Sequence, residues 1–355
     1  MLTTIVILAL AASVQDAAPP YRVEPLDVTN GDVKLAGTLT MPASSGPVPA
    51  VVLITGSGPQ NRDEEVFGFK VFATLADHLT RQGIAVYRYD DRGVGESTGN
   101  LAQSTTEDFA GDALAAVVKL RSLPGIDPKR VGLIGHSEGA VAAAIAAARS
   151  QDVAFIVMLA GTATSGDQVL GQQARDMARA QGASPEQIDR IVTAQRAAMD
   201  ALLRDADPEE RSRLIRAVVE AQLDAAPAAQ LAMIPDREAF VAKTTKQAST
   251  QMASPWMKFL VSFDPADALR KVTVPVYAAF GELDVQVPPA MHEKPMREAL
   301  KQNAQVTVKV YEGANHLFQK AKTGGVMEYA SLAKAFVPEL PQDVAGWILA
   351  VGRSR

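Results

Sequence analysis

The chain has 355 residues, a formal net charge of −5 at pH 7, 47% hydrophobic residues and no cysteine. The mild negative charge argues against nucleic acid as a main partner, and the lack of cysteine excludes disulfides and thiolate metal sites. The length and the apolar content suffice for one large α/β core with an insertion.

An apolar run at residues 5–12 is followed by small residues and Pro19-Pro20. The run is too short to span a bilayer and is typical of the apolar segment of a secretory signal peptide. No Lys or Arg precedes it, so a buried first strand is the alternative. We expect residues 1–20 to be a signal peptide and the protein to be exported, periplasmic or secreted, with no stable membrane anchor after cleavage.

The first half of the chain alternates between strand and helix patterns. Residues 21–28 and 33–40 alternate in polarity around Asn30-Gly31, which predicts a hairpin. Continuous apolar runs predict buried strands, and the amphipathic segments between them predict helices. The strands are expected at 50–54, 84–89, 131–135 and 153–159, and the helices at 69–81, 109–123 and 138–149. This alternation predicts a parallel sheet with helices on both faces and a site at the carboxyl ends of its strands.

Helical patterns without strands occupy residues 164–263. Ser184-Pro185-Glu186-Gln187 is a capping box with proline in the first turn, and Asp207-Pro208-Glu209-Glu210 opens another helix. This insertion is expected to cover the strand ends as a cap. Near its end, Trp256 and Phe259 belong to an apolar cluster that either lines a substrate pocket or packs the cap against the core.

Strand patterns resume after the insertion, at 274–280 and 306–311, with helices expected at 291–301 and 344–351. The domain organisation predicted from these patterns is one α/β core in two halves, residues 21–163 and 264–355, interrupted by a helical cap of residues 164–263.

The segment Gly135-His136-Ser137-Glu138-Gly139 joins a predicted strand to a predicted helix. Gly-x-Ser-x-Gly in this context is typical of a nucleophile elbow, in which the serine has a strained backbone. Gly135 and Gly139 would let the strand and the helix cross closely. An ordinary strand-to-helix turn is one alternative.

A dinucleotide-binding turn is a second alternative, because Gly132, Gly135 and Gly139 have a loose glycine spacing. That fold places an acidic residue at the end of the next strand, whereas this chain has Ala160-Gly161-Thr162 there.

A serine nucleophile needs a base, and the base needs a partner that fixes its tautomer. The chain has four histidines. His78 lies in a helical pattern, His136 is expected to pack near the site rather than act as a base, and His292 is expected at an exposed helix start. His316, in a glycine-containing loop after the last strand, is the predicted base.

Asp284 follows the preceding strand and is the predicted partner of His316. Glu282 is its competitor, and an Asx-turn is the structural alternative for Asp284. The resulting order, Ser137 then Asp284 then His316, is the order that the elbow fold uses.

The developing oxyanion needs N–H donors that are already in place. One is expected to be the backbone N–H of Glu138. The other is expected from the glycine-containing loop after Ile54, where Ser57 N–H is the predicted donor. A phosphate-binding loop is the alternative, but the sequence lacks the Gly-Lys-Ser/Thr ending of such loops.

Taken together, these segments resemble the α/β-hydrolase superfamily, and within it bacterial secreted carboxylesterases related to the serine aminopeptidases and prolyl oligopeptidases. The resemblance rests on Ile54-Thr55-Gly56-Ser57-Gly58-Pro59-Gln60-Asn61-Arg62-Asp63, Tyr89-Asp90-Asp91-Arg92-Gly93-Val94-Gly95-Glu96-Ser97, Gly135-His136-Ser137-Glu138-Gly139, Gly281-Glu282-Leu283-Asp284 and Asn315-His316. It implies a mostly parallel eight-stranded sheet with helices on both faces and a helical cap.

The resemblance also implies that Ser137 is the nucleophile, His316 the base and Asp284 the orienting acid, with Ser57 and Glu138 as oxyanion donors. One departure matters: the His-Gly that the family has before the oxyanion residue is Thr55-Gly56 here. The backbone N–H donor does not depend on the side chain that differs. The sequence does not show which residue supports the loop in place of the histidine.

Charged residues follow two of the predicted strands, and they are Arg62, Asp63, Asp90, Asp91 and Arg92. Both signs are present, as a buried hydrogen-bonded network requires. Such a network holding the two loops is the favoured interpretation. Substrate contact is the alternative, for which Thr55, Arg62, Asp63 and His136 are the candidates.

The sequence thus predicts an exported serine hydrolase that cleaves small to medium acyl esters through an acyl-enzyme. The expected partner is a small-molecule ester, with no cofactor, no metal and no nucleic acid. A peptidase or amidase with the same triad is the nearest alternative. A non-catalytic binding protein on this fold would be expected to lack a triad member, and a dinucleotide oxidoreductase lacks its acidic residue.

Overall fold

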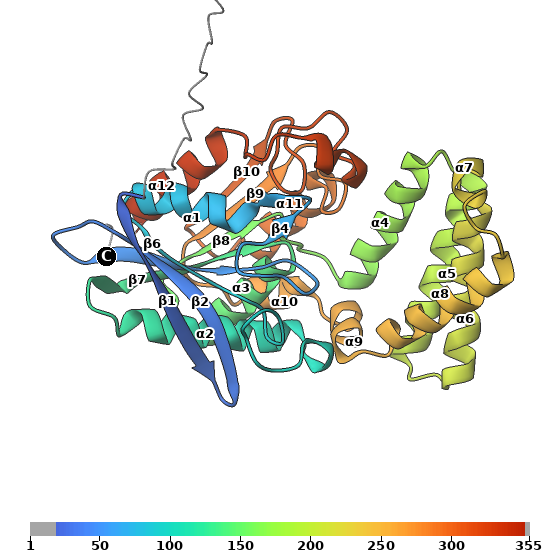
Figure 1. The fold of residues 1–355 in the computed structure, drawn as a ribbon, viewed down its shortest axis with the longest axis horizontal. Helices are drawn as coiled ribbons and strands as arrows, with labels where there is room; N and C mark the ends of the chain where they lie inside the picture. The colour runs from blue at the N-terminus through green and yellow to red at the C-terminus, as the bar shows by residue number, and fades with distance from the viewer. Residues whose placement is uncertain (1–18, 352–355) are drawn as a thin grey trace, which may run out of the picture.

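An eight-stranded sheet forms the centre of the computed structural model, which describes residues 19–351 (Figure 1). In order across the sheet, the strands are β1 (Tyr21–Asn30), β2 (Val33–Pro42), β6 (Ala85–Tyr89), β3 (Val48–Ile54), β7 (Ile126–His136), β8 (Ile156–Leu159), β9 (Val276–Gly281) and β10 (Val306–Tyr311). The pairs β1–β2 and β2–β6 are antiparallel, and all other neighbours are parallel. The predicted mostly parallel sheet of eight strands is therefore confirmed.

Helices cover both faces of this sheet. On one face α1 (Val71–Arg81) lies beside α12 (Glu339–Val351), and on the other α2 (Thr106–Arg121), α3 (Glu138–Arg149) and α10 (Pro265–Leu269) pack together (Figure 1). The remaining core elements are α11 (Pro289–Ala299) and the short 3₁₀ helices η1 (Leu101–Gln103) and η2 (Val326–Ser331). Every residue of β3 is buried, as expected for a strand covered on both sides.

Two helix starts differ from the sequence predictions for local reasons. The helix expected at 69–81 begins at Val71, because β5 (Phe69–Lys70) pairs with β4 (Glu65–Val66) as a small hairpin. The helix expected at 109–123 begins earlier, at Thr106, because Thr105 and Asp108 form a capping box around its first turn.

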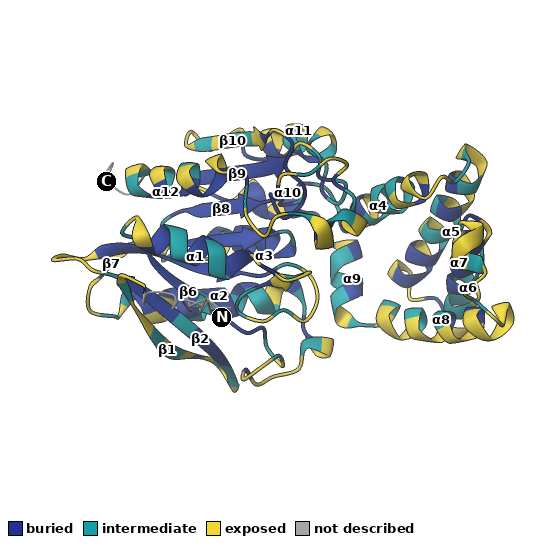
Figure 2. Ribbon diagram, turned by 45° about the horizontal axis from the view of Figure 1, so that its top comes forward, coloured by how far each residue is buried: buried dark blue, intermediate teal, exposed yellow. Residues whose placement is uncertain are grey.

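All elements between residues 164 and 263 are helices. They are α4 (Gly166–Ala180), α5 (Pro185–Leu203), α6 (Pro208–Asp224), α7 (Ala228–Leu231), α8 (Arg237–Met252) and α9 (Pro255–Ser262). The predicted capping box at Ser184 is present at the start of α5. Helices α5 to α8 stand away from the sheet, and α4 and α9 lie between them and the core (Figures 1 and 2).

The cap has small apolar clusters of its own. Met199 and Leu202 of α5 pack against Met257 and Val261 of α9, and α9 in turn contacts α2 and η1 of the core. Helix α9 therefore connects the interior of the cap to the core.

The prediction that His292 lies at an exposed helix start is wrong. His292 is completely buried on α11, and its Nδ1 accepts a hydrogen bond of 3.3 Å from the backbone N–H of Ala163. The face of α11 that carries His292 packs against the core rather than toward solvent. Burial lowers the pKa of His292 to about 4, so that its imidazole is neutral near pH 7.

The predicted signal peptide of residues 1–20 lies outside the described residues except for Pro19 and Pro20. Within residues 19–351, no helix combines the length and the apolar character needed to cross a bilayer.

The crossing of β7 and α3 leaves no room for side chains at two glycines. A Cβ atom added to Gly135 would lie 2.0 Å from the carbonyl oxygen of Gly139, and one added to Gly139 would lie 2.1 Å from that of Ile54. Both neighbours are backbone atoms, which cannot move aside as a flexible side chain would. The close approach of strand and helix therefore depends on these two glycines.

We expect Gly139→Ala to lower the free energy of unfolding by at least about 3 kcal/mol, because the new methyl group overlaps the β3 backbone. Circular dichroism during thermal unfolding measures the change. Gly346→Ala is the matched control, since Gly346 also lies in a helix and a Cβ there meets nothing within 4 Å. Equal melting temperatures for the wild type and Gly139→Ala would contradict the prediction.

Candidate active site

Ser137 is the single residue between β7, which ends at His136, and α3, which begins at Glu138. Its φ of 53° and ψ of −116° are a conformation that residues with side chains rarely adopt. The Ser137 N–H donates to the carbonyl oxygen of Leu159 in the neighbouring strand β8 at 2.8 Å. This bond and the close crossing of β7 and α3 hold the strained turn. Ser137 lines a mainly apolar cavity at the carboxyl ends of the strands.

The loop after β3 approaches Ser137 closely. A Cβ atom added to Gly56 would lie 3.3 Å from the Cβ of Ser137, which is a tight contact. The next residue, Ser57, lines the same cavity as Ser137 and Glu138. Within residues 19–351, no hydrogen bond from the Ser57 N–H is found, and Glu138, as the first residue of α3, has no acceptor for its N–H inside the helix. Both N–H groups are thus available to an oxygen atom in the cavity.

Asp284 and His316 are joined by a short hydrogen bond. His316 Nδ1 lies 2.7 Å from Asp284 Oδ2, and both side chains are buried. Asp284 Oδ1 accepts bonds of 2.8 Å from the N–H groups of Gln286 and Val287. Burial raises the pKa of Asp284, but His316 and these two donors outweigh it and hold that pKa below its usual value. The ionised carboxylate fixes the proton on His316 Nδ1 and leaves Nε2 free to act as a base.

Glu282, the competing carboxylate, is not the partner of His316. It is exposed, and it accepts a hydrogen bond of 2.8 Å from the N–H of Gly313.

Ser137 and His316 line the same cavity from different loops. Among the described residues, no hydrogen bond joins their side chains. Such bonds are often long in enzymes without substrate and shorten in the complex. The structure therefore brings the serine, the histidine and the carboxylate to one site and pairs the last two.

The cavity has a volume of about 350 Å³ and is bounded by both the core and the cap. The cap contributes mainly apolar side chains, which are Val169, Leu170, Trp256, Phe259, Leu260 and Phe263. The charged side chains among its lining residues, apart from histidine, are Glu64 and Glu138, and none is basic. The cavity is thus suited to an apolar, uncharged group beside Ser137. Trp256 and Phe259, the two candidate contacts in the cap, both line it.

His136 belongs to an arrangement that joins three loops. Its Nδ1 lies 2.8 Å from Glu64 Oε1, and its Nε2 lies 3.0 Å from the carbonyl oxygen of His316. The same Glu64 oxygen accepts the N–H of Gly56 at 2.7 Å. The elbow, the loop after β3 and the loop of His316 are therefore tied together by one buried pair.

The surroundings of His136 favour its doubly protonated form. A neutral imidazole has one N–H, yet here one ring nitrogen faces a carboxylate and the other a carbonyl oxygen. Burial lowers the pKa of His136, but the Glu64 carboxylate and the His316 carbonyl outweigh it, so the pKa is raised above its usual value. His136 thus supports the site and is not positioned as the base for Ser137.

Glu64 was not predicted from the sequence. It has a φ of 47° and lies almost fully buried, just before β4. No motif marks it, and its only signal in the sequence is an acidic residue in the loop after a buried strand.

The other candidate contacts lie behind the cavity. Arg62 forms a salt bridge of 2.6 Å with Asp90, and Asp63 pairs with Arg88. Neither Arg62 nor Asp63 is among the residues that line the cavity. Their positions and ion pairs favour the charged network over substrate contact.

Thr55 and Asp91 belong to the same network, and their hydrogen bonds support the loop that follows β3. The Thr55 hydroxyl donates to Asp91 Oδ1 at 2.6 Å, and the Gln60 N–H donates to Asp91 Oδ2 at 3.0 Å. Thr55 does not line the cavity, so it supports the loop rather than contacting substrate. Arg92 pairs with Asp112 of α2 at 2.6 Å.

The sequence of this chain matches a known protein family. The profile described as "Alpha/beta hydrolase family" matches residues 51–323. The chain belongs to the alpha/beta hydrolase family. This confirms the family resemblance predicted from the sequence motifs.

Among curated proteins, esterase EstD of Thermotoga maritima is 28% identical to this chain over 303 residues. The matched region is 85% of this chain and 62% of EstD. The chain therefore spans less than two thirds of the length of this relative.

Solved structures of alpha/beta hydrolases show the same fold. Esterase Pf2001 of Pyrococcus furiosus has a TM-score of 0.56 at 14% identity, with 93% of this chain and 91% of that chain covered. Proline iminopeptidase of Mycobacterium smegmatis has a TM-score of 0.54 at 20% identity, with coverages of 93% and 99%. At these identities the likeness concerns the fold alone.

The raised pKa of Asp91 makes the folding stability of the chain depend on pH. Burial, together with the nearby carboxylates of Glu64 and Glu138, outweighs the hydrogen bonds from Thr55 and Gln60 and raises the pKa of Asp91 to about 7. A folded-state pKa above the unfolded value means that the folded chain binds the proton more tightly. Asp91 therefore costs stability progressively as pH rises from about 4 to about 7.

We expect the melting temperature of Asp91→Asn, relative to wild type, to rise between pH 4 and pH 7 and to level off above about pH 7. Scanning calorimetry across this range measures the difference. Asp32→Asn, in the exposed turn between β1 and β2, is the control and should show no such trend. A difference between Asp91→Asn and wild type that is independent of pH would contradict the assignment.

Proposed function

We propose that this chain is a serine hydrolase that cleaves carboxylic esters through an acyl-enzyme intermediate. The observation that carries the proposal is the buried Asp284–His316 pair opening onto the same cavity as Ser137 at its strained turn. The sequence similarity to a protein named as an esterase, EstD, supports an ester substrate.

In this mechanism the Ser137 oxygen attacks the ester carbonyl while His316 Nε2 takes the hydroxyl proton. The carbonyl oxygen becomes an oxyanion, which the N–H groups of Ser57 and Glu138 stabilise, each by roughly 3 kcal/mol. His316 then gives the proton to the leaving alcohol. Water repeats the sequence on the acyl-enzyme, releasing the acid and restoring Ser137.

The cavity supports esters with small to medium acyl chains. Its volume of about 350 Å³ lies at the low end for small-molecule sites. The cap side chains around it are apolar, and the absence of basic residues among its lining disfavours substrates that carry an extra carboxylate or phosphate. We also propose, from residues 1–20, that the protein is exported.

Replacing Ser137 by Ala should lower kcat/KM for p-nitrophenyl butyrate by at least about 10⁴-fold, because the nucleophile is lost. A fluorophosphonate probe should label the wild type at Ser137 and leave Ser137→Ala unlabelled, as mass spectrometry of the peptide would show. Ser45→Ala, in the exposed loop between β2 and β3, is the matched control and should retain activity and labelling.

A wild type that is unlabelled and no faster than Ser137→Ala would contradict the proposal. Faster turnover of aminoacyl anilides than of the corresponding aminoacyl esters would favour a peptidase instead, as in the iminopeptidase that shares the fold.

A further inference from the structure

Trp256 lies between two cavities of the described chain. On one side it lines the catalytic cavity with Ser137. On the other side it lines a groove of about 660 Å³ between the core and the cap. The indole ring is the side chain common to both linings, so it forms part of the wall that separates them.

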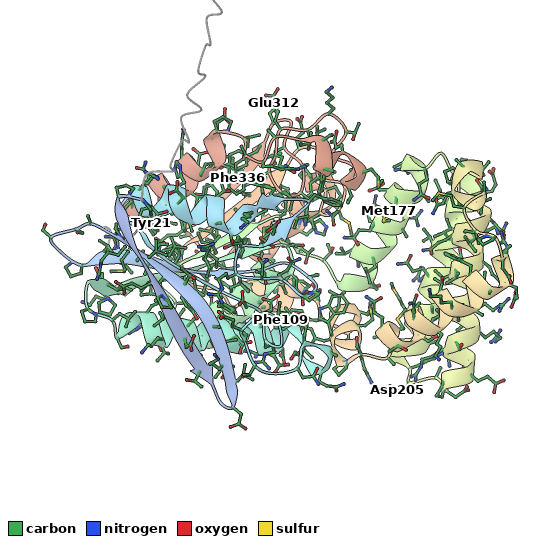
Figure 3. All side chains as sticks on the ribbon, in the orientation of Figure 1. Tyr21, Phe109, Met177, Asp205, Glu312 and Phe336 are labelled. Atoms are coloured by element: carbon green, nitrogen blue, oxygen red, sulfur yellow. The ribbon has the colours of Figure 1, made fainter. Side chains whose placement is uncertain are left out.

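Two core segments along this wall each contribute one residue to the catalytic cavity and a nearby residue to the groove. In the loop after β3, Ser57 lines the catalytic cavity and Gly58 lines the groove. In α2, Thr106 lines the cavity and Phe109 the groove. Phe109 lies at the side of the core nearest α9, the helix that carries Trp256 (Figure 3). The two spaces are therefore adjacent, and Trp256 is the large cap side chain between them.

A hydrogen bond fixes the position of the indole ring. Trp256 Nε1–H donates to Glu138 Oε1 at 2.8 Å, and the Thr106 hydroxyl donates to the same oxygen at 2.7 Å. Glu138 is almost fully buried. A buried carboxylate that accepts both donors holds the ring more firmly than apolar packing alone would.

The groove beyond Trp256 has a largely apolar lining. Its apolar members from the core and the cap include Leu101, Ala102, Phe109, Ala253 and Pro255. A hydrocarbon chain extended from the catalytic cavity would find a compatible surface there if the indole ring did not intervene.

We propose that Trp256 sets the upper limit on the length of the apolar chain in the ester substrate, by closing the catalytic cavity against this groove. The inference rests on the proposed ester hydrolysis and assigns its chain-length specificity to one side chain. The two roles of Trp256 are separable, since the ring volume forms the wall and the indole N–H orients the ring on Glu138.

The test compares kcat/KM for p-nitrophenyl butyrate, octanoate and laurate in the wild type, Trp256→Ala and Trp256→Phe. Each additional methylene that becomes buried is worth roughly a factor of four. For Trp256→Ala we therefore expect the laurate-to-butyrate ratio to rise at least about tenfold. For Trp256→Phe, which keeps a ring but loses the N–H, we expect a similar reduction for all three esters and a ratio within about threefold of wild type.

A second variant tests whether the space that Trp256→Ala opens is this groove. Ala102 is exposed on η1 and lines the groove from the core side. Adding Ala102→Trp to Trp256→Ala should fill the groove and return the ratio toward the wild-type value. A parallel series of butyrate esters with lengthening alcohols identifies whether the acyl or the alcohol chain enters it.

A laurate-to-butyrate ratio in Trp256→Ala unchanged from wild type would overturn the inference, as would a gain that Ala102→Trp does not reverse. These outcomes leave ester hydrolysis intact if the wild type still cleaves butyrate through Ser137. Loss of the proposed function itself would appear differently, as a wild type without Ser137-dependent cleavage of any ester in the series.

Discussion

The close crossing of β7 and α3 is the constraint on which the rest of the site depends. Gly135 and Gly139 allow the strand and the helix to meet at backbone contact, and this leaves one residue, Ser137, to make the turn with a φ of 53°. A strained residue persists only where its surroundings leave no alternative. Here the hydrogen bond to Leu159 from one side and the β3 backbone from the other provide that restraint. The same crossing directs the start of α3, with its available N–H of Glu138, toward the cavity.

Buried charged groups surround this turn, and two pairs of them connect the loops of the site. His316 and two backbone donors keep Asp284 ionised, which gives the histidine its proton on Nδ1. Glu64 and His136 are hydrogen-bonded to each other and join the three loops that meet at the site. Such pairs contribute little net stability, because desolvation offsets their attraction, but they define which loop lies against which. These pairs therefore act mainly in positioning, since each one ends on a residue that borders Ser137 or His316.

Much of the core and of the candidate site could be predicted because local patterns report them directly. Continuous apolar runs marked the buried strands, and the Gly-x-Ser-x-Gly segment between strand and helix marked Ser137. The predicted order of Ser137, Asp284 and His316 then followed from residues placed after strands. Contacts between distant segments were not predictable in this way. The burial of His292, the pairing of Glu64 with His136 and the Trp256–Glu138 hydrogen bond each join segments separated by between 72 and 129 residues. No periodicity or motif encodes such a contact, which arises only once the helices and the cap are packed.

We propose above all that the turn places Ser137 beside two N–H groups that bind an oxyanion. The most direct test is a crystal structure of the protein after reaction with a p-nitrophenyl alkylphosphonate, whose phosphorus adduct imitates the tetrahedral intermediate. We expect phosphorus bonded to Ser137 Oγ, with one phosphoryl oxygen within hydrogen-bonding distance of the N–H groups of both Ser57 and Glu138. An adduct on another residue, or a phosphoryl oxygen that contacts neither N–H, would contradict it.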